Sequence, residues 1–327
     1  MTFPQRRLRR LRRTDALRRL VAQTTLSVDD FVAPLFVREG IDGPVDISSL
    51  PGVQQHTLDS LDAEVGRLIG LGIPAVMLFG IPVSKDAEGS QAWADEGIMQ
   101  VALRRLSDTF GDRIVLMADL CVDEYTSHGH CGIVDAAGEV DNDATVEIYQ
   151  RVAIAQATAG AHVVAPSGMM DGQVAAIRSA LDGDGFQDVA ILAYAAKYAS
   201  AMYGPFREAV DVTIVDGGDR KGYQQDIRNA REALEEVRFD ISEGADMVMV
   251  KPAHTYLDLI AAVRADVDVP VAAYHVSGEY AMLKAAAANG WIDGDAAAIE
   301  VLTSIKRAGA DIILTYLAAE VAELLQR

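Results

Sequence analysis

Ala245-Asp-Met-Val-Met-Val-Lys251, followed by Pro252, is a short apolar run that ends in a lysine. The four residues before Lys251 carry no charged side chain, as is typical of a strand buried on both faces of a parallel sheet. A second run, Ile191-Leu-Ala-Tyr-Ala-Ala196, ends in the same way at Lys197. Each run therefore predicts a buried strand that carries an ammonium group at its C-terminal end.

Runs of this kind recur along the chain and alternate with amphipathic stretches, several of which close with Gly, a common helix stop. Eight such strands predict a (β/α)8 TIM barrel of the α/β class, although the count alone leaves a doubly wound sheet open. No GxGxxG motif follows the first strand, which argues against a dinucleotide-binding sheet. The expected strands are 31–37, 75–80, 113–120, 162–165, 190–196, 245–251, 269–276 and 311–317, and the expected helices include 60–72, 144–160, 169–181, 256–267 and 299–308.

Composition narrows the class of protein. The net charge of −19 over 327 residues argues against nucleic acid or an anionic membrane as the main partner. No window reaches 18 apolar residues, and the basic start is not followed by an apolar segment with a cleavage site, so we expect neither a transmembrane span nor a secretory signal. Two cysteines, Cys121 and Cys131, do not form the framework of a secreted protein. A cytoplasmic enzyme is expected.

The first 19 residues are strongly basic, with eight arginines against a single acid, Asp15. Such a run is most often a solvated arm, and it could bind nucleic acid. Because the rest of the chain is acidic, docking on the acidic surface of a neighbouring subunit is the better interpretation. We expect residues 1–28 to form an arm for subunit contacts and residues 29–327 to form a catalytic barrel.

The two strand-end lysines would lie at the mouth where TIM-barrel enzymes place their active sites. Burial lowers the pKa of an ammonium group, and a second ammonium nearby lowers it further, so a neutral and nucleophilic amine becomes available. Lys251 and Lys197 therefore indicate imine chemistry on carbonyl substrates. The alternative for each is a lysine that reaches solvent or pairs with a carboxylate.

A loop rich in metal-ligating residues follows the third strand, within Asp119-Leu-Cys-Val-Asp-Glu-Tyr-Thr-Ser-His-Gly-His-Cys-Gly132. Thiolate, carboxylate and imidazole groups together suit zinc. The spacing lacks a CxxC pattern, so a structural loop with two reduced thiols and two capping histidines is an equal alternative. The possible ligands are Cys121, Asp123, His128, His130 and Cys131.

The longest connection runs from Lys197 to residue 245, and its irregular first part, about 198–228, predicts a lid over the barrel mouth. Within it, Arg207, Arg220 and Gln224 offer donors for a substrate carboxylate, although surface solvation is the default for any one of them. Ser277 and Tyr316 offer two hydroxyl groups at the ends of the last two strands.

These segments resemble the δ-aminolevulinic acid dehydratase (porphobilinogen synthase) family over essentially the whole chain. The resemblance implies a TIM barrel with an arm that embraces a neighbouring subunit, and a homo-octamer. It also implies condensation of two 5-aminolevulinate molecules into porphobilinogen with loss of two waters, a lyase reaction of haem biosynthesis. The matching segments are 125–132, 141–145, 165–167, 170–173, 203–208, 218–221, 249–253, 276–281 and 305–311.

The resemblance also assigns roles to residues. Lys251 would form a Schiff base with the first-bound, or P-side, substrate, Lys197 would bind the second, or A-side, substrate, and Asp119 would take part in proton transfers. The expected substrate-binding residues are Tyr203 and Phe206 for the pocket walls, Arg207, Arg220 and Gln224 for the A-side carboxylate, Ser277 and Tyr316 for the P-side carboxylate, and Ser167 near a strand end.

The chain departs from the family pattern in the metal loop. Zinc-dependent members carry three cysteines where this chain has Cys121, Asp123 and Cys131, so the loop lies between the zinc and magnesium types. We expect zinc, because thiolates prefer that metal. Gly222 replaces a cysteine of some zinc-dependent members, so a second zinc is not expected.

Two further features concern regulation and the lid. Glu236 matches the carboxylate that binds an activating, allosteric magnesium ion in many bacterial members, and its alternative is a solvated helix glutamate. Residues 225–227 replace a proline-containing stretch of the family, which leaves the lid conformation open.

Two other functions are compatible with parts of the sequence. A class I aldolase-like lyase would need only one catalytic lysine and no cysteine-containing loop. A nucleic-acid-binding protein would use the arginine-rich arm, and its binding would weaken with salt.

Overall fold

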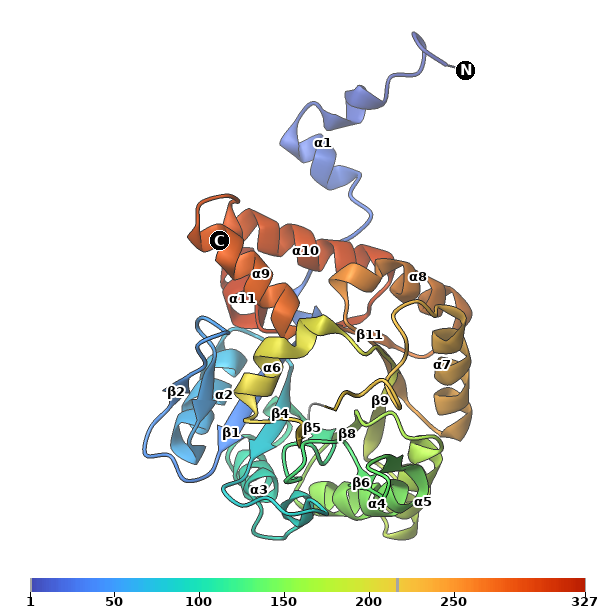
Figure 1. The fold of residues 1–327 in the computed structure, drawn as a ribbon. Coiled ribbons are helices and arrows are strands. Elements are labelled where there is room, and N and C mark those ends of the chain that lie inside the picture. Colours follow the sequence, from blue (N-terminus) through green and yellow to red (C-terminus); the bar gives the residue numbers. More distant parts are fainter. Residues whose placement is uncertain (1, 216–217, 327) are drawn as a thin grey trace.

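The computed structural model describes residues 2–215 and 218–326, so residues 216 and 217 of the predicted lid lie outside it. Within that part, eight parallel strands close into a barrel (Figure 1), because the first strand pairs with both the second and the last. The predicted TIM barrel is confirmed. The barrel strands are β1 (Phe31–Arg38), β4 (Ala75–Ile81), β5 (Val115–Leu120), β8 (Val163–Pro166), β9 (Ala190–Lys197), β10 (Met247–Lys251), β11 (Val271–His275) and β12 (Ile312–Thr315).

Helices surround the barrel and connect successive strands (Figure 1). They lie close to the expected ranges, but the strand expected at 113–120 begins only at Val115, because Gly111–Arg113 forms a 3-10 turn. The surrounding helices are α2 (Leu58–Gly70), α3 (Ile98–Phe110), α4 (Asn142–Thr158), α5 (Gln173–Gly183), α7 (Arg231–Glu243), α8 (Leu257–Asp266), α9 (Ser277–Ala288), α10 (Gly294–Ala308) and α11 (Ala318–Leu325).

Short strands, one short helix and several 3-10 turns lie in the loops between the barrel elements. The strands β2 and β3 extend the sheet beside β1, whereas β6 and β7 form a separate hairpin in the loop after β5. These elements are β2 (Val45–Asp46), β3 (Gln54–His56), β6 (Ile133–Val134), β7 (Val140–Asp141), α6 (Gly204–Ala209) and the 3-10 turns η2 (Val28–Asp30), η3 (Ser90–Ala92), η4 (Gly111–Arg113), η5 (Ala201–Tyr203) and η7 (His254–Tyr256).

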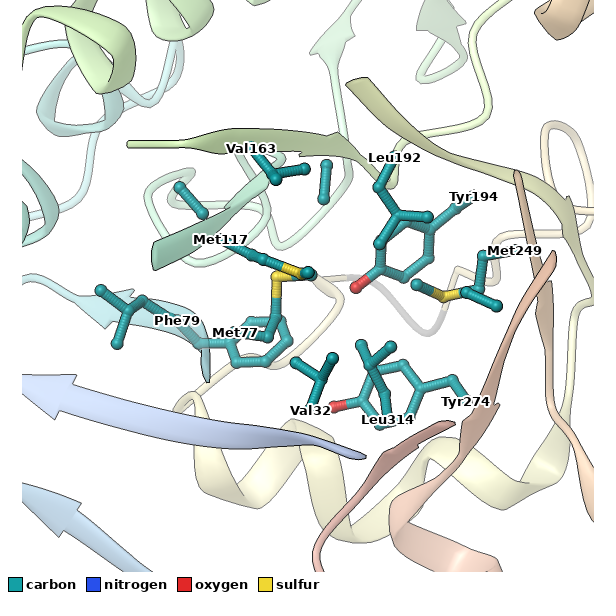
Figure 2. Close-up of a cluster of buried hydrophobic side chains, with 14 of the residues drawn as sticks. Val32, Met77, Phe79, Met117, Val163, Leu192, Tyr194, Met249, Tyr274 and Leu314 are labelled. Atoms are coloured by element: carbon teal, nitrogen blue, oxygen red, sulfur yellow. The ribbon is translucent and has the colours of Figure 1, made fainter. Parts of the chain in front are cut away.

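The inside of the barrel is filled with side chains. Figure 2 shows Met77, Met117, Leu192, Met249 and Leu314 converging from different strands, and all of them are buried. Interdigitated aliphatic and thioether side chains of this kind make a packed core rather than a channel. The polar groups of the site therefore rest on a rigid apolar floor.

The basic N-terminal segment extends away from the barrel (Figure 1). It contains η1 (Leu8–Arg12) and α1 (Asp15–Leu20), neither of which has a buried residue. The Thr14 side chain caps α1 by accepting a hydrogen bond from the Leu17 backbone N–H at 3.2 Å. None of the helices in the described residues combines the length and apolarity needed to span a lipid bilayer.

Candidate active site

The two lysines predicted from the strand ends lie side by side. Lys251 ends β10 and pairs in register with Lys197, which ends β9. Each side chain is only about 5% exposed. The barrel thus brings two amines to one point of its mouth, as the sequence predicted.

Lys251 lies in an aromatic cage. Its Nζ lies 4.4 Å from the ring centre of Tyr274, 5.0 Å from that of Tyr194, 5.3 Å from that of Tyr203 and 5.2 Å from that of Phe206. Burial, together with the nearby ammonium of Lys197, lowers the pKa of Lys251 to about 7. At neutral pH a large fraction of this amine is therefore uncharged and nucleophilic.

Lys197 belongs to a chain of polar groups with Ser167 and Asp119. Its Nζ donates a hydrogen bond to the Ser167 backbone carbonyl at 2.5 Å, and the Ser167 Oγ donates to Asp119 Oδ2 at 3.1 Å. Burial raises the pKa of Asp119 to about 6, although both lysines oppose the rise. Asp119 Oδ1 has no hydrogen-bond partner among the described groups. A carboxyl group that titrates near neutrality beside two amines can accept and return protons.

Three of the five predicted metal ligands converge beside the lysine cavity, which Asp123 also lines. The ligand atoms of Cys121, Asp123 and Cys131 lie within 4.8 Å of one another, and all three residues are buried. Burial raises the pKa of Cys121, whereas the pKa of Cys131 is lowered despite its burial, because it interacts with the Cys121 thiol and the Arg220 guanidinium. Two thiols and a carboxylate at this spacing fit a divalent metal that accepts sulfur ligands.

The two histidines of the loop have other partners in the described structure. His128 Nε2 lies 3.1 Å from the Ala87 carbonyl, and His130 Nδ1 lies 3.2 Å from the Tyr223 hydroxyl. Gly129 between them has φ +74°, and a Cβ there would lie 2.6 Å from the Thr213 carbonyl oxygen. This glycine therefore lets the metal loop pack against the lid.

Arg220 connects the lid to the metal loop. Its Nη2 donates to Asp123 Oδ2 at 2.7 Å and to the Gly129 carbonyl at 2.9 Å, and its Nη1 lies 3.3 Å from Cys131 Sγ. The Arg220 guanidinium holds the pKa of Asp123 well below its usual range, although burial by itself would raise that pKa. The arginine predicted to hold a substrate carboxylate thus pairs here with the predicted metal ligands.

The lid covers the lysines closely. Gln225, near its end, donates its backbone N–H to the Lys197 carbonyl at 3.0 Å and accepts from Ala199 N at 2.9 Å, so it briefly continues the sheet beside β9. The cavity at the lysines is only about 20 Å³. This is room for about one water molecule, so the lid must move before two substrates can bind.

The remaining candidates for binding the substrate carboxylates lie in two places, on the lid and beside the aromatic cage. Arg207 lines the lysine cavity, whereas Gln224 is buried within the lid, and its Nε2 lacks a hydrogen-bond partner in the described structure. Ser277 Oγ accepts from Phe206 N at 3.0 Å and donates to the Met202 carbonyl at 3.2 Å. The Tyr316 hydroxyl lies 3.1 Å from the Tyr274 hydroxyl, next to the aromatic cage.

Glu236 lies outside this centre, on α7. It is half-buried and lines a second cavity of about 520 Å³ together with Asp171 and Glu232. Burial raises the pKa of Glu236 to about 6, and these acidic neighbours add to the rise. Several carboxylates in one cavity favour a hydrated divalent cation.

The sequence left three residues of the centre unassigned. Tyr194 and Tyr274 contribute rings to the cage around Lys251, and Glu124 lines the same cavity as both lysines. Tyr194 lies inside the same strand run as Lys197, three positions earlier, so strict alternation would have placed the two side chains on opposite faces, and the sequence contained no usable signal. Glu124 follows a predicted ligand directly, and its position alone could have marked it.

Comparisons with known proteins agree with this site. A family model described as "Delta-aminolevulinic acid dehydratase" matches residues 5–324. Two proteins of that name, from Streptomyces coelicolor and Mycobacterium tuberculosis, are each 58% identical to this chain; the first alignment covers 99% of this chain and 98% of the relative, the second 98% of each.

A solved structure is also similar. The enzyme of that name from Toxoplasma gondii, crystallised with the reaction product porphobilinogen, is 45% identical and superimposes with a TM-score of 0.96 over 98% of this chain and 91% of that one. Neither an aldolase-like lyase nor a nucleic-acid-binding protein is favoured by these matches. The chain belongs to the δ-aminolevulinic acid dehydratase family.

Proposed function

We propose that Lys251 and Lys197 each bind one of the two substrate molecules in the reaction of this family. As a family member, the chain condenses two molecules of 5-aminolevulinate to porphobilinogen with loss of two waters. The observation that carries the division of roles is the pairing of two buried lysines at one barrel mouth. Lys251, with its lowered pKa, is assigned the P-side substrate, and Lys197 the A-side substrate.

The chemistry follows from the ketone of each substrate. The neutral amine of Lys251 attacks the ketone carbon, and loss of water leaves an imine. A protonated imine withdraws electrons, so the adjacent carbon is more easily deprotonated and the imine carbon is more easily attacked. One carbon–carbon bond and one carbon–nitrogen bond then join the two molecules, each ketone oxygen leaves as water, and both lysines are released.

Asp119 and Ser167 are proposed to move the protons of these steps. Within the described residues Asp119 Oδ1 has no hydrogen-bond partner, and Oδ2 accepts a hydrogen bond from the Ser167 hydroxyl. Its pKa of about 6 suits a group that alternates between proton acceptor and donor near neutral pH. The closed lid would keep bulk water from hydrolysing the imines.

The substrate carboxylates are proposed to bind at two places. Arg207, Arg220 and Gln224 would hold the A-side carboxylate, and Ser277 and Tyr316 the P-side carboxylate. Arg220 would exchange its contact with Asp123 for the substrate when a metal neutralises that carboxylate.

We also propose that Cys121, Asp123 and Cys131 hold zinc. The buried thiols favour this metal over magnesium. When bound, zinc would supply a Lewis acid beside the A-side substrate. Reduced thiols fit a cytoplasmic location, where disulfides are rare.

Regulation and assembly are proposed on separate observations. Glu236, in its acidic cavity, is assigned an activating magnesium ion. The exposed basic arm, with Phe3, Leu8 and Leu20 uncovered, is assigned to contacts with a neighbouring subunit in a homo-octamer.

Trapping the imine tests the assignment of Lys251. Incubation with 5-aminolevulinate and borohydride, followed by peptide mapping, is expected to give a reduced adduct on Lys251. The adduct should disappear in Lys251→Met and persist in Lys221→Met, because Lys221 is exposed on the lid. Absence of any adduct on Lys251 in the native chain would refute the imine mechanism.

A further inference from the structure

Glu279 is a buried acid that joins two loops of the barrel mouth. It lies in the first turn of α9, and its side chain is only 3% exposed. Its Oε2 accepts hydrogen bonds from the backbone N–H groups of Val276 at 2.9 Å and Ala253 at 3.4 Å, and its Oε1 accepts from the Thr255 N–H at 3.1 Å. A single carboxylate therefore ties the loop after β10 to the loop after β11.

Both loops adjoin residues that are assigned to the same substrate. Lys251 ends β10, and because Pro252 has no N–H, Ala253 carries the first backbone donor after the lysine. Ser277, a proposed ligand of the P-side carboxylate, directly follows Val276. Glu279 thus holds the backbone close to the P-side amine and, at the same time, close to a P-side hydroxyl group.

Glu279 itself stays away from the reacting groups. It is not among the described residues that line the lysine cavity, and its oxygens are used by backbone donors of the protein. Burial raises the pKa of Glu279, and the N–H groups that it accepts from oppose this rise. Ala253 and Val276 are buried too, so their N–H groups would lose their partner without gaining water if this carboxylate were removed.

We propose that Glu279 is a positioning residue for the P-side substrate, because it fixes the separation between Lys251 and Ser277. This inference rests on the proposed function. Two methylene groups join the ketone carbon of 5-aminolevulinate to its carboxylate, so the groups that bind these two ends must keep a matching separation. A carboxylate bonded to both loops sets that separation before the substrate enters, and the bound ketone is then held against the Lys251 amine.

Two ketones test this role. Levulinate (4-oxopentanoate) is the substrate without its amine, and butanone is levulinate with its carboxylate replaced by hydrogen. Both can form an imine on Lys251 that cyanoborohydride traps by reduction, but only levulinate can use Ser277. The ratio of the two trapping rates, measured by mapping the modified peptide, therefore reports how well the carboxylate-binding group is aligned with the amine.

In Glu279→Gln we expect the levulinate-to-butanone ratio to fall about tenfold or more, while the butanone rate stays within about threefold of the native value. An amide has one oxygen and one NH2 group, so in either orientation it turns a donor toward the N–H of Thr255 or of Val276, and one loop is released. Glu279→Asp keeps the charge but is one methylene shorter, so it should lower the ratio by a smaller factor and with less loss of stability. Asp293→Ala removes the residue that caps α10 by accepting from the Ala296 N–H, and as the matched control it should keep the native ratio.

Other results overturn the inference. A native ratio in both Glu279 variants would mean that this carboxylate does not align the two groups. Equal slowing of levulinate and butanone, or the same fall in Asp293→Ala, would mean that Glu279 only stabilises the fold. If the native chain forms no adduct on Lys251, or traps both ketones equally, the proposed function itself fails, and this inference fails with it.

Discussion

Lys251 lies directly opposite Lys197 because β9 contains one more residue than β10 just before the two lysines. Val248 pairs with Ala193, but Val250 pairs with Ala196. Side chains of a regular strand alternate between faces, and Tyr194 already points into the barrel (Figure 2). Strict alternation would therefore turn Lys197 outward, and the irregularity returns it to the inner face.

The coupling of the two amines predicts a shift in pH dependence. Burial and then the Lys197 ammonium lower the pKa of Lys251 to about 7, so imine formation should increase as the pH rises through about 7. In Lys197→Met one of these causes is lost, and the increase should move to higher pH. Borohydride trapping of levulinate on Lys251 across a pH series measures the midpoint. Lys221→Met should keep the native midpoint, and an unshifted midpoint in Lys197→Met would contradict the coupling.

The metal site predicts a loss of zinc on removal of one ligand. Cys131→Ser should weaken zinc binding by at least about tenfold, because a thiolate ligand is replaced by a hydroxyl group. Zinc per chain after dialysis against graded chelator gives the affinity. Asp112→Asn, at a fully exposed acid, should bind zinc as the native chain does. Equal zinc retention in Cys131→Ser would contradict the site.

Glu236 predicts a loss of magnesium activation without loss of the basal reaction. Glu236→Gln removes a charge from the acidic cavity on α7 but leaves the lysines and their cage unchanged. Activity titrated with magnesium should then remain near its magnesium-free value. Glu235→Gln, one position earlier and exposed, should keep the native response. A native response in Glu236→Gln would remove the magnesium assignment.

If the N-terminal arm makes subunit contacts, its deletion should change the assembly of the protein. Deletion of residues 2–13 removes η1 and the exposed Leu8 and Leu11, and should convert the proposed octamer into smaller species. Sedimentation velocity at several protein concentrations measures this change. The double variant Leu8→Ala, Leu11→Ala should weaken the assembly by a smaller amount, since it retains the arginines. If the truncated chain sediments as the full chain does, the arm is not needed for assembly.

Much of the barrel follows from local sequence. Uninterrupted apolar runs such as 247–250 can be buried only in a sheet covered on both faces, and the helical stretches between them require parallel strands. Strand ends were less predictable. The strand expected from Arg113 begins only at Val115, opposite Ala75, because Arg113 belongs to a 3-10 turn.

The sequence predicted most residues of the site but few of the contacts between them. The sequence placed Cys121, Asp123 and Cys131 on one loop, but their closeness depends on how that loop folds back against the lid. Likewise, nothing local to Arg220 indicates that it pairs with Asp123, 97 positions away. Such contacts depend on loop packing, which has no sequence periodicity.

The sequence by itself determined the barrel, the two buried lysines and the family, because these depend on hydrophobic patterning and on local motifs. Only the tertiary structure decided that Lys197 faces Lys251 and that Arg220 pairs with Asp123. The first depends on the register between neighbouring strands, and the second on how the lid packs against the loop after β5. Both are properties of groups far apart in the chain, and both arise only when the barrel closes.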